Sequence, residues 1–140
     1  MSRHFRLKTA AATQPVTTDD VKTYARVAHA VEDTIILSWL KAATKLAEDY
    51  QHRAYIEQTW NLTYDNYPTK CIIVPRPQLM TIESIKYYDV DDTESTFAAS
   101  NYFIDITSEI GRVVLNSGAS WPSTTLRPVN GILIEFTAGY

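Results

Sequence analysis

The sequence predicts an α+β fold in which helices come first and an antiparallel β-sheet or small β-sandwich of about six strands follows. Apolar residues recur at helical spacing up to about residue 53. From Ala54 onward they alternate with polar residues in short runs separated by turn-forming residues. With 140 residues, the chain is long enough for one domain with a core. We therefore expect an arm at 1–16 and a single domain at 17–140, with a helical part (17–53) and a β-rich part (54–140).

The helical part begins after an arm, because residues 1–16 show no apolar period. Thr17 has the character of an N-cap, and Asp20 stands three residues later, where a capping box places its acidic partner. These two residues predict a short first helix that starts directly after Thr17.

A second, longer helix is predicted from Asp33, which we expect to be its N-cap. Its apolar residues follow the i, i+3, i+4, i+7 spacing and predict one continuous stripe. They are Ile36, Trp39, Leu40, Ala43, Leu46, Ala47 and Tyr50. The other face carries Lys41, Lys45, Glu48 and Asp49, which we expect to meet water or a neighbouring protein. Together the helices predict an αα-hairpin whose apolar side needs a cover.

The β-rich part opens with strict alternation of apolar and polar residues over 55–65, typical of a half-buried strand. Turn-forming residues separate it from further short runs. We expect these later strands at 71–74, 81–90, 101–107, 111–116 and 130–140.

Composition excludes several classes of protein. The net charge of −3 argues against a strongly basic nucleic-acid binder. Cys71 is the single cysteine, so no intramolecular disulfide or cysteine-based zinc site can form, and its apolar surroundings predict a buried, inert thiol. No apolar run approaches the ~18 residues of a membrane span, so we expect no membrane partner and synthesis in the cytoplasm.

Motifs for catalysis are missing from the sequence. His4, His29 and His52 lack the spacing of metal ligands, and the acidic run 89–94 lacks the glycine of a calcium loop. No nucleotide-binding or nucleophile-elbow motif occurs. We expect no catalytic residue, no cofactor and no metal, and hence a protein that is not an enzyme.

Three residues of the β-rich part are candidates for protein contacts. Pro75 and Pro77 predict a stiff corner that holds Arg76 outward, and Arg127 precedes Pro128 in a similar way. Trp121 lies in a loop, where it either folds back as a lid on the core or anchors an interface. Lys41 and Lys45 on the second helix are further candidates, although a solvated helix face is an equal reading.

Several segments of the chain resemble the head–tail connector (adaptor) family of long-tailed bacteriophages, prophages and gene transfer agents. The resemblance runs from Pro15 to Tyr140. The segments that carry it, in order, are PVTTDDVKTYARV, EDTII, RAYIEQTWNLTYDNYP, VPRPQL, IESIKYYD, GRVVLNSGASWP and IEFTAGY.

The resemblance implies a structural protein of the virion neck that assembles as a dodecameric ring beneath the portal protein. Such a ring extends the DNA channel, passes double-stranded DNA without sequence-specific binding and receives the stopper or tail-completion proteins. The basic arm residues Arg3, Arg6 and Lys8 are then candidates for contact with portal or DNA. Two alternatives stay open: a stopper or tail-completion protein of the same neck, and a ligand-binding β-module that uses the Trp121 loop.

Overall fold

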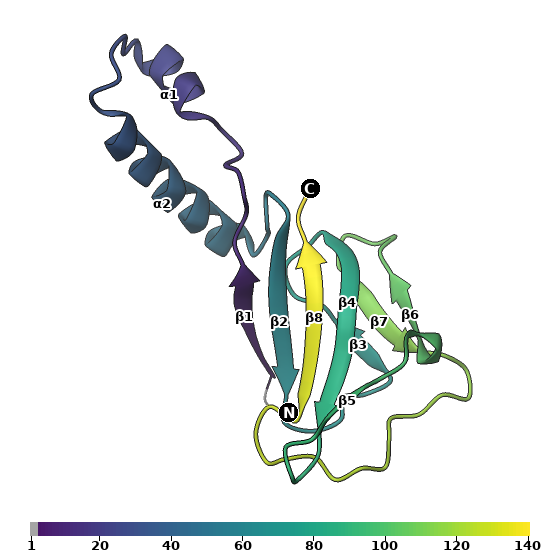
Figure 1. The fold of residues 1–140 in the computed structure, drawn as a ribbon. Helices are drawn as coiled ribbons and strands as arrows, with labels where there is room; N and C mark the ends of the chain where they lie inside the picture. Colours follow the sequence, from purple (N-terminus) through teal and green to yellow (C-terminus); the bar gives the residue numbers. More distant parts are fainter. Residues whose placement is uncertain (1–2) are drawn as a thin grey trace.

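The computed structural model describes residues 3–140 and consists of a helical hairpin that projects from a two-sheet β-sandwich (Figure 1). The helices are α1 (Thr18–Ala25), α2 (Asp33–Gln51) and the 3₁₀ turn η1 (Ala99–Asn101). The strands are β1 (Arg3–Thr9), β2 (Gln58–Tyr64), β3 (Cys71–Ile73), β4 (Leu79–Tyr88), β5 (Glu94–Thr96), β6 (Tyr102–Asp105), β7 (Arg112–Leu115) and β8 (Ile132–Ala138). The predicted α+β class, helices followed by antiparallel strands, is confirmed.

The predicted capping box starts α1. Thr17 Oγ1 accepts a hydrogen bond from the Asp20 amide at 3.1 Å, and the Asp20 carboxylate accepts one from the Thr17 amide at 3.0 Å. A hydrogen bond from the Thr17 hydroxyl to the Asp20 carboxylate (2.6 Å), followed by the bond from the Thr17 amide, lowers the pKa of Asp20. The reciprocal pairing satisfies two amides that a helix start leaves without partners, so this short helix has a defined first turn.

Helix α2 begins one residue earlier than predicted. Glu32 occupies the N-cap without a side-chain bond, and Asp33 is the first helical residue, so the prediction of Asp33 as the cap was wrong. The Asp33 carboxylate instead pairs with Lys22 of α1 at 2.8 Å and ties the two helices together. At its other end α2 stops at His52, whose left-handed backbone (φ 55°) carries its amide to the Glu48 carbonyl.

The larger sheet contains five antiparallel strands in the order β1-β2-β8-β4-β5. Alternation directs Leu62 and Tyr64 of β2 inward, and their register partners in β8 are Ile134 and Ile132. The smaller sheet has the order β3-β7-β6 and covers this face with Ile72, Val113, Leu115 and Tyr102. The core lies between the sheets, and no residue of α1 or α2 belongs to its cluster of buried side chains.

The N-terminal segment differs from the expected arm. Residues 3–9 form β1, which pairs with β2 along its length, whereas Met1 and Ser2 lie outside the described residues. Every β1 side chain is exposed. Phe5 and Leu7 alternate with Arg6 and Lys8, but two apolar residues are too short a pattern to predict a strand. Among residues 3–140, no helix is long and apolar enough to cross a membrane.

Candidate functional site

Arg76 lies inside the protein, and the prediction that the proline corner holds it outward was wrong. Its backbone takes a left-handed conformation (φ 65°) between Pro75 and Pro77, and the residue is only 8% exposed. That backbone turns the side chain toward the C-terminal end of α2. The corner therefore presents its guanidinium to the hairpin and not outward, while its stiffness stays a prediction.

The Arg76 guanidinium joins the helical hairpin to the sandwich. Nη1 donates to the main-chain oxygens of Glu48 at 2.6 Å and Arg53 at 3.3 Å, while Nη2 donates to the Asp49 carboxylate at 2.5 Å. The cation also lies 5.0 Å from the Trp60 ring centre. A positive charge at the C-terminal end of a helix is favourable because it meets the negative end of the helix dipole. We call this group of contacts the Arg76 clamp.

Two carboxylates of α2 complete the Arg76 clamp. The Glu48 carboxylate accepts from the Tyr55 amide at 2.8 Å and from Gln58 Nε2 at 2.9 Å, which fixes the connection from α2 to β2. The hydrogen bond from Arg76 holds the pKa of Asp49 below its usual range, with a smaller contribution from Lys45. Both side chains were predicted to meet water or a partner; Asp49 is exposed as predicted, Glu48 is half-buried, and both also hold the base of the hairpin.

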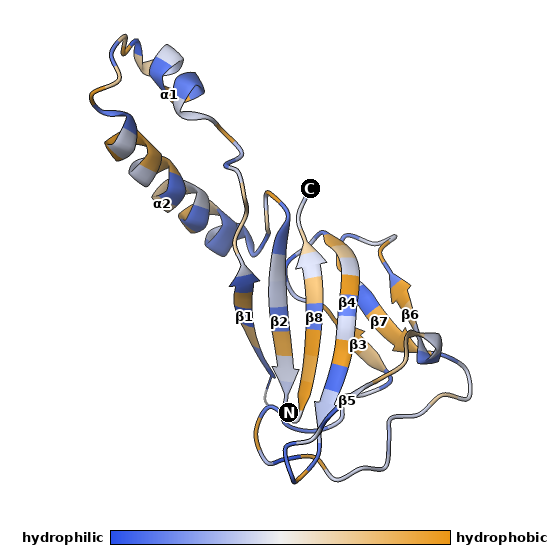
Figure 2. Cartoon of the chain, in the orientation of Figure 1, coloured by the Kyte–Doolittle hydropathy of each residue, from blue (hydrophilic) through white to orange (hydrophobic). Residues whose placement is uncertain are grey.

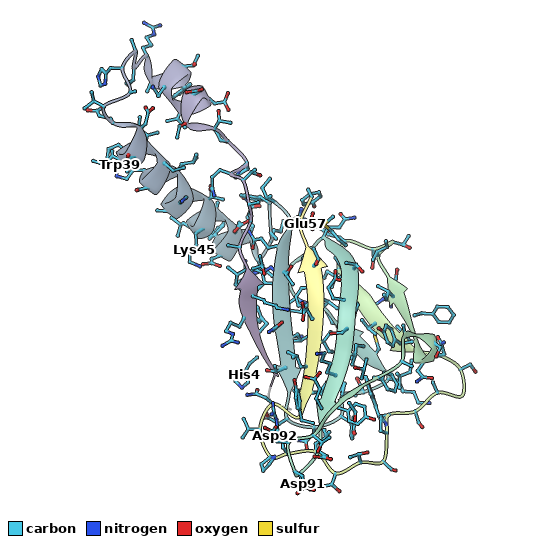
Figure 3. The ribbon with its side chains drawn as sticks, viewed as in Figure 1. His4, Trp39, Lys45, Glu57, Asp91 and Asp92 are labelled. Carbon is cyan, nitrogen blue, oxygen red and sulfur yellow. The ribbon has the colours of Figure 1, made fainter. Side chains whose placement is uncertain are left out.

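Helix α2 carries a second apolar surface that nothing covers. Ile36 is its one buried residue, and it faces α1. On the outer side an exposed row follows the spacing i, i+4, i+7, i+11 and i+15, which places its members on one side of the helix. We call this row the outer stripe, and it comprises Ile35, Trp39, Ala42, Leu46 and Tyr50. Figure 2 shows orange residues on α2 outside the contact with α1, and Figure 3 shows Trp39 pointing away from the sandwich.

The single stripe predicted for α2 is thus split in two. Trp39, Leu46 and Tyr50 were expected beside Ile36, but they are 68%, 72% and 86% exposed. The helix is apolar over a wide arc, and α1 is too short to cover all of it. Lys41 and Lys45 flank the outer stripe; both are exposed, and Lys45 pairs with Asp49 at 3.3 Å. Their predicted exposure is confirmed, while a role in protein contacts stays a prediction.

Trp121 folds back onto the core, the first of its two predicted alternatives. Its ring centre lies 4.7 Å from that of Phe97 and 5.9 Å from that of Tyr67, and the side chain is half-buried. With aromatic neighbours on its ring, Trp121 packs as a partly buried residue against the core of the sandwich.

Arg127 is tied to its own loop. Its guanidinium donates to the Asn130 carbonyl at 2.8 and 3.1 Å, pairs with Asp92 of the β4–β5 turn and lies 4.0 Å from the Tyr88 ring centre. These contacts link the long loop before β8 to the acidic turn. Arg127 is therefore less available for partners than predicted, although part of it remains exposed.

The basic residues of the expected arm occupy both sides of β1. Register with β2 places Arg3 beside Tyr64, whose side chain points inward, and places Arg6 beside Asn61 on the outer side. Lys8 shares the outer side and pairs with Glu135 of β8 at 2.5 Å. The sequence predicted one basic arm that contains all three, and the structure separates them along a strand.

The smaller sheet has an exposed apolar face that the sequence did not reveal. Register across β3, β7 and β6 lines up Cys71, Val114 and Phe103 in one row on the side away from the core. Phe103 is 69% exposed, and Ile73 in the neighbouring row is 52% exposed. Cys71 is exposed as well, so the prediction of a buried thiol was wrong: alternation along β3 turns Ile72 inward and its neighbours outward. We call this surface the outer face of the small sheet.

No group of three or more histidine, cysteine, aspartate or glutamate side chains lies close enough to hold a metal ion within residues 3–140. Two exposed apolar surfaces and the Arg76 clamp distinguish the described part of the molecule, and exposed apolar surface of this kind is typical of sites that contact other molecules.

Comparison with solved structures agrees with this description of the fold. The chain is similar to one in the neck of an empty gene transfer agent (GTA) particle computed with C6 symmetry, with a TM-score of 0.83 and 20% identity over 98% of this chain and 71% of that one. A chain in the virion of a native GTA particle gives 0.80 and 20% over 97% and 71%. A chain in the neck of a native GTA particle computed with C12 symmetry gives 0.71 and 21% over 96% and 70%.

No protein-family model matches the sequence, and no curated protein matches it. At 20–21% identity, the likeness to these three chains establishes a shared fold that includes the hairpin and both sheets.

Proposed function

We propose that this protein is a structural component of a virion neck, the head–tail connector (adaptor) that forms a ring under the portal. The observation that carries the proposal is the fold: 98% of the chain superposes with a TM-score of 0.83 on a chain from a particle neck. The sequence resemblance to the adaptor family supports the same role independently. In this role the protein acts by assembly in the neck between head and tail, after synthesis in the cytoplasm of the host bacterium, and not by catalysis.

The exposed surfaces support a role in assembly. A chain that leaves Trp39, Tyr50 and Phe103 largely exposed carries apolar surface that a solitary globular protein would be expected to cover. Three kinds of neighbour supply such a cover. They are the other subunits of a homo-oligomeric ring, here a dodecamer, the portal protein above it, and the stopper or tail-completion protein below it. Lys41, Lys45 and the exposed part of Arg127 are then contacts at the rims of these interfaces.

The channel role is compatible with the charge of the protein. A ring that passes double-stranded DNA works best when it binds phosphates weakly and without sequence preference, and a net charge of −3 meets that requirement. Arg3, Arg6 and Lys8 remain candidates for contact with portal or DNA; Arg6, on the outer side of β1, is the most accessible by its position.

Electron microscopy of particle necks tests the proposal. Particles assembled with a tagged copy of this chain should show it as the ring in direct contact with the portal, and purified portal should retain the protein. Density for the chain one level lower, in contact with the adaptor and not with the portal, would instead assign the role of stopper or tail-completion protein. A chain that enters no neck and binds neither portal nor tail proteins would refute both roles.

A further inference from the structure

The two uncovered apolar surfaces lie on different elements and on different sides of the molecule. The outer stripe belongs to α2 in the hairpin, while the outer face of the small sheet belongs to β3, β7 and β6 (Figure 1). They also differ in shape: one is a narrow convex helix, the other a short three-stranded sheet. A subunit with two unlike surfaces on different sides is suited to head-to-tail contact.

The outer stripe is large enough to contribute a substantial part of an interface. Trp39 and Tyr50 are 68% and 86% exposed, and Leu46 is 72% exposed. Since an aromatic side chain buries roughly 150–250 Å², these residues and Ile35 leave on the order of 500 Å² of apolar surface open. A stable interface of standard size takes about 800 Å² from each partner, so the stripe supplies more than half of one face.

The small sheet presents a matching surface. Phe103 and Ile73 are exposed at opposite edges of its outer face, with Val114 of β7 between the two edge strands. The row that contains Ile73 continues with Arg112 of β7 and Asp105 of β6. These two residues form an ion pair in which Arg112 Nε donates to the Asp105 carboxylate at 3.0 Å. That pairing neutralises both charges, so this face can lie against an apolar helix without leaving an isolated charge uncovered.

We infer that the outer stripe of α2 in one subunit packs on the outer face of the small sheet in the next copy of this chain, and that this contact builds the ring. The inference rests on the proposed function for its closure into a ring. A stripe-to-stripe dimer would bury one surface twice and leave the small sheet open. The head-to-tail contact buries both surfaces on every subunit, and it repeats until the ring closes.

Two single substitutions and their mixture test the head-to-tail arrangement. Trp39→Glu disables the stripe and keeps the sheet intact, while Phe103→Glu disables the sheet and keeps the stripe intact. Both residues are exposed, so each variant should keep the circular dichroism spectrum and urea midpoint of the wild type. In sedimentation velocity at a concentration where the wild type forms multimers, each variant alone should be monomeric.

The mixture gives the decisive result. The intact stripe of the Phe103→Glu variant should bind the intact sheet of the Trp39→Glu variant, so an equimolar mixture should form heterodimers and no larger species. A mixture that stays monomeric, or variants that assemble like the wild type, would overturn the inference. Lys41→Glu serves as the matched control on the same helix outside the stripe, and it should reduce assembly far less than Trp39→Glu.

Cross-linking through the native Cys71 provides an independent readout. Ala42 lies in the stripe, so an Ala42→Cys variant treated with a short bismaleimide should give a ladder of dimers, trimers and higher products joined between positions 42 and 71. The Ala42→Cys, Cys71→Ser double variant should give none. Dimers from the double variant would indicate stripe-to-stripe contact, and monomers from both at the highest soluble concentration would exclude self-association; each result refutes the inference.

Failure of the inference and failure of the proposed function have different signatures. If the chain forms the neck ring but no 42–71 cross-link appears within it, the contact is wrong and the function stands. If the cross-linked ladder forms but the chain enters no particle neck, the contact stands and the function is wrong.

Discussion

Arg76 donates a hydrogen bond to Asp49 at 2.5 Å, and this bond joins a proline-bounded corner of the β-sandwich to the last turn of α2. The two residues are 27 positions apart and belong to the two halves of the molecule. The same guanidinium holds the main-chain oxygens of Glu48 and Arg53. Arg76 is therefore the residue on which the position of the hairpin depends most directly.

Replacing Arg76 by alanine should lower the free energy of unfolding by about 2 kcal/mol. A charge-assisted hydrogen bond contributes roughly 1.5–3 kcal/mol net, and the loss stays toward the low end of this range because water can hydrate Asp49 in the variant. Arg76→Lys should recover only part of this loss, since an ammonium group cannot reach three acceptors as a planar fork does. Urea unfolding measures both. Lys86→Ala, which removes an exposed ion pair with Glu94, is the control and should cost less than about 1 kcal/mol. Equal effects of Arg76→Ala and Lys86→Ala would contradict the clamp.

Acid should weaken the same contact. The pKa of Asp49 is lowered in the folded protein by the hydrogen bond from Arg76, relative to the ordinary value of 3.8. A carboxyl whose pKa is depressed on folding contributes stability that is fully present above the unfolded pKa and is lost as pH falls through the folded one. We expect Asp49→Asn to flatten the decline of the urea midpoint below about pH 4. An unchanged decline would show that other carboxyls, such as Asp105, account for it.

Gly139 should tolerate no side chain. Its φ is +139°, and a Cβ there would lie 2.6 Å from both the Ile56 carbonyl carbon and the Glu57 amide nitrogen, which are backbone atoms that cannot move aside cheaply. Gly118 also has a positive φ (+83°), but a Cβ added there would meet nothing within 4 Å, so Gly118→Ala reports the conformational cost alone. We expect Gly139→Ala to reduce stability by at least about 2 kcal/mol more than Gly118→Ala. Thermal or urea unfolding of the two variants decides this, and equal losses would contradict it.

Trp121 should contribute stability through its aromatic neighbours. Because the side chain is half-buried against Phe97 and Tyr67, Trp121→Ala should cost about 2–3 kcal/mol, and Trp121→Phe less than half of that. The Trp121→Phe variant should also lose part of the tryptophan emission intensity, while the blue-shifted emission of the buried Trp60 remains. A loss below about 0.5 kcal/mol in both variants would indicate a surface residue, as the interface alternative requires.

The sequence predicted those elements whose signals are local. The capping box of Thr17 and Asp20 and the alternation along β2 and β8 depend on nearest neighbours, and the structure reproduces them. β1 was missed because its apolar alternation comprises only Phe5 and Leu7, and its strand character comes from pairing with β2, which is distant in sequence.

The candidate site was predicted less well than the fold, for a physical reason. Two prolines fix the backbone around Arg76, but they do not determine which way the left-handed residue between them points. That direction follows from the position of the α2 C-terminus, a tertiary relationship. Likewise, the helical spacing of α2 identified its apolar residues but not how many of them the short helix α1 covers.

The single-ended attachment of the hairpin has a mechanical consequence. A helix of 19 residues is about 28 Å long, and in Figure 1 α2 extends away from the sandwich from the base that Arg76 holds. A force applied at the far end therefore acts on that base through a long lever arm, and a small rotation at Arg76 becomes a large displacement at the α1–α2 turn. The contacts of Arg76, together with the bonds from Tyr55 and Gln58 to Glu48, set how accurately the distant end of the hairpin is aimed.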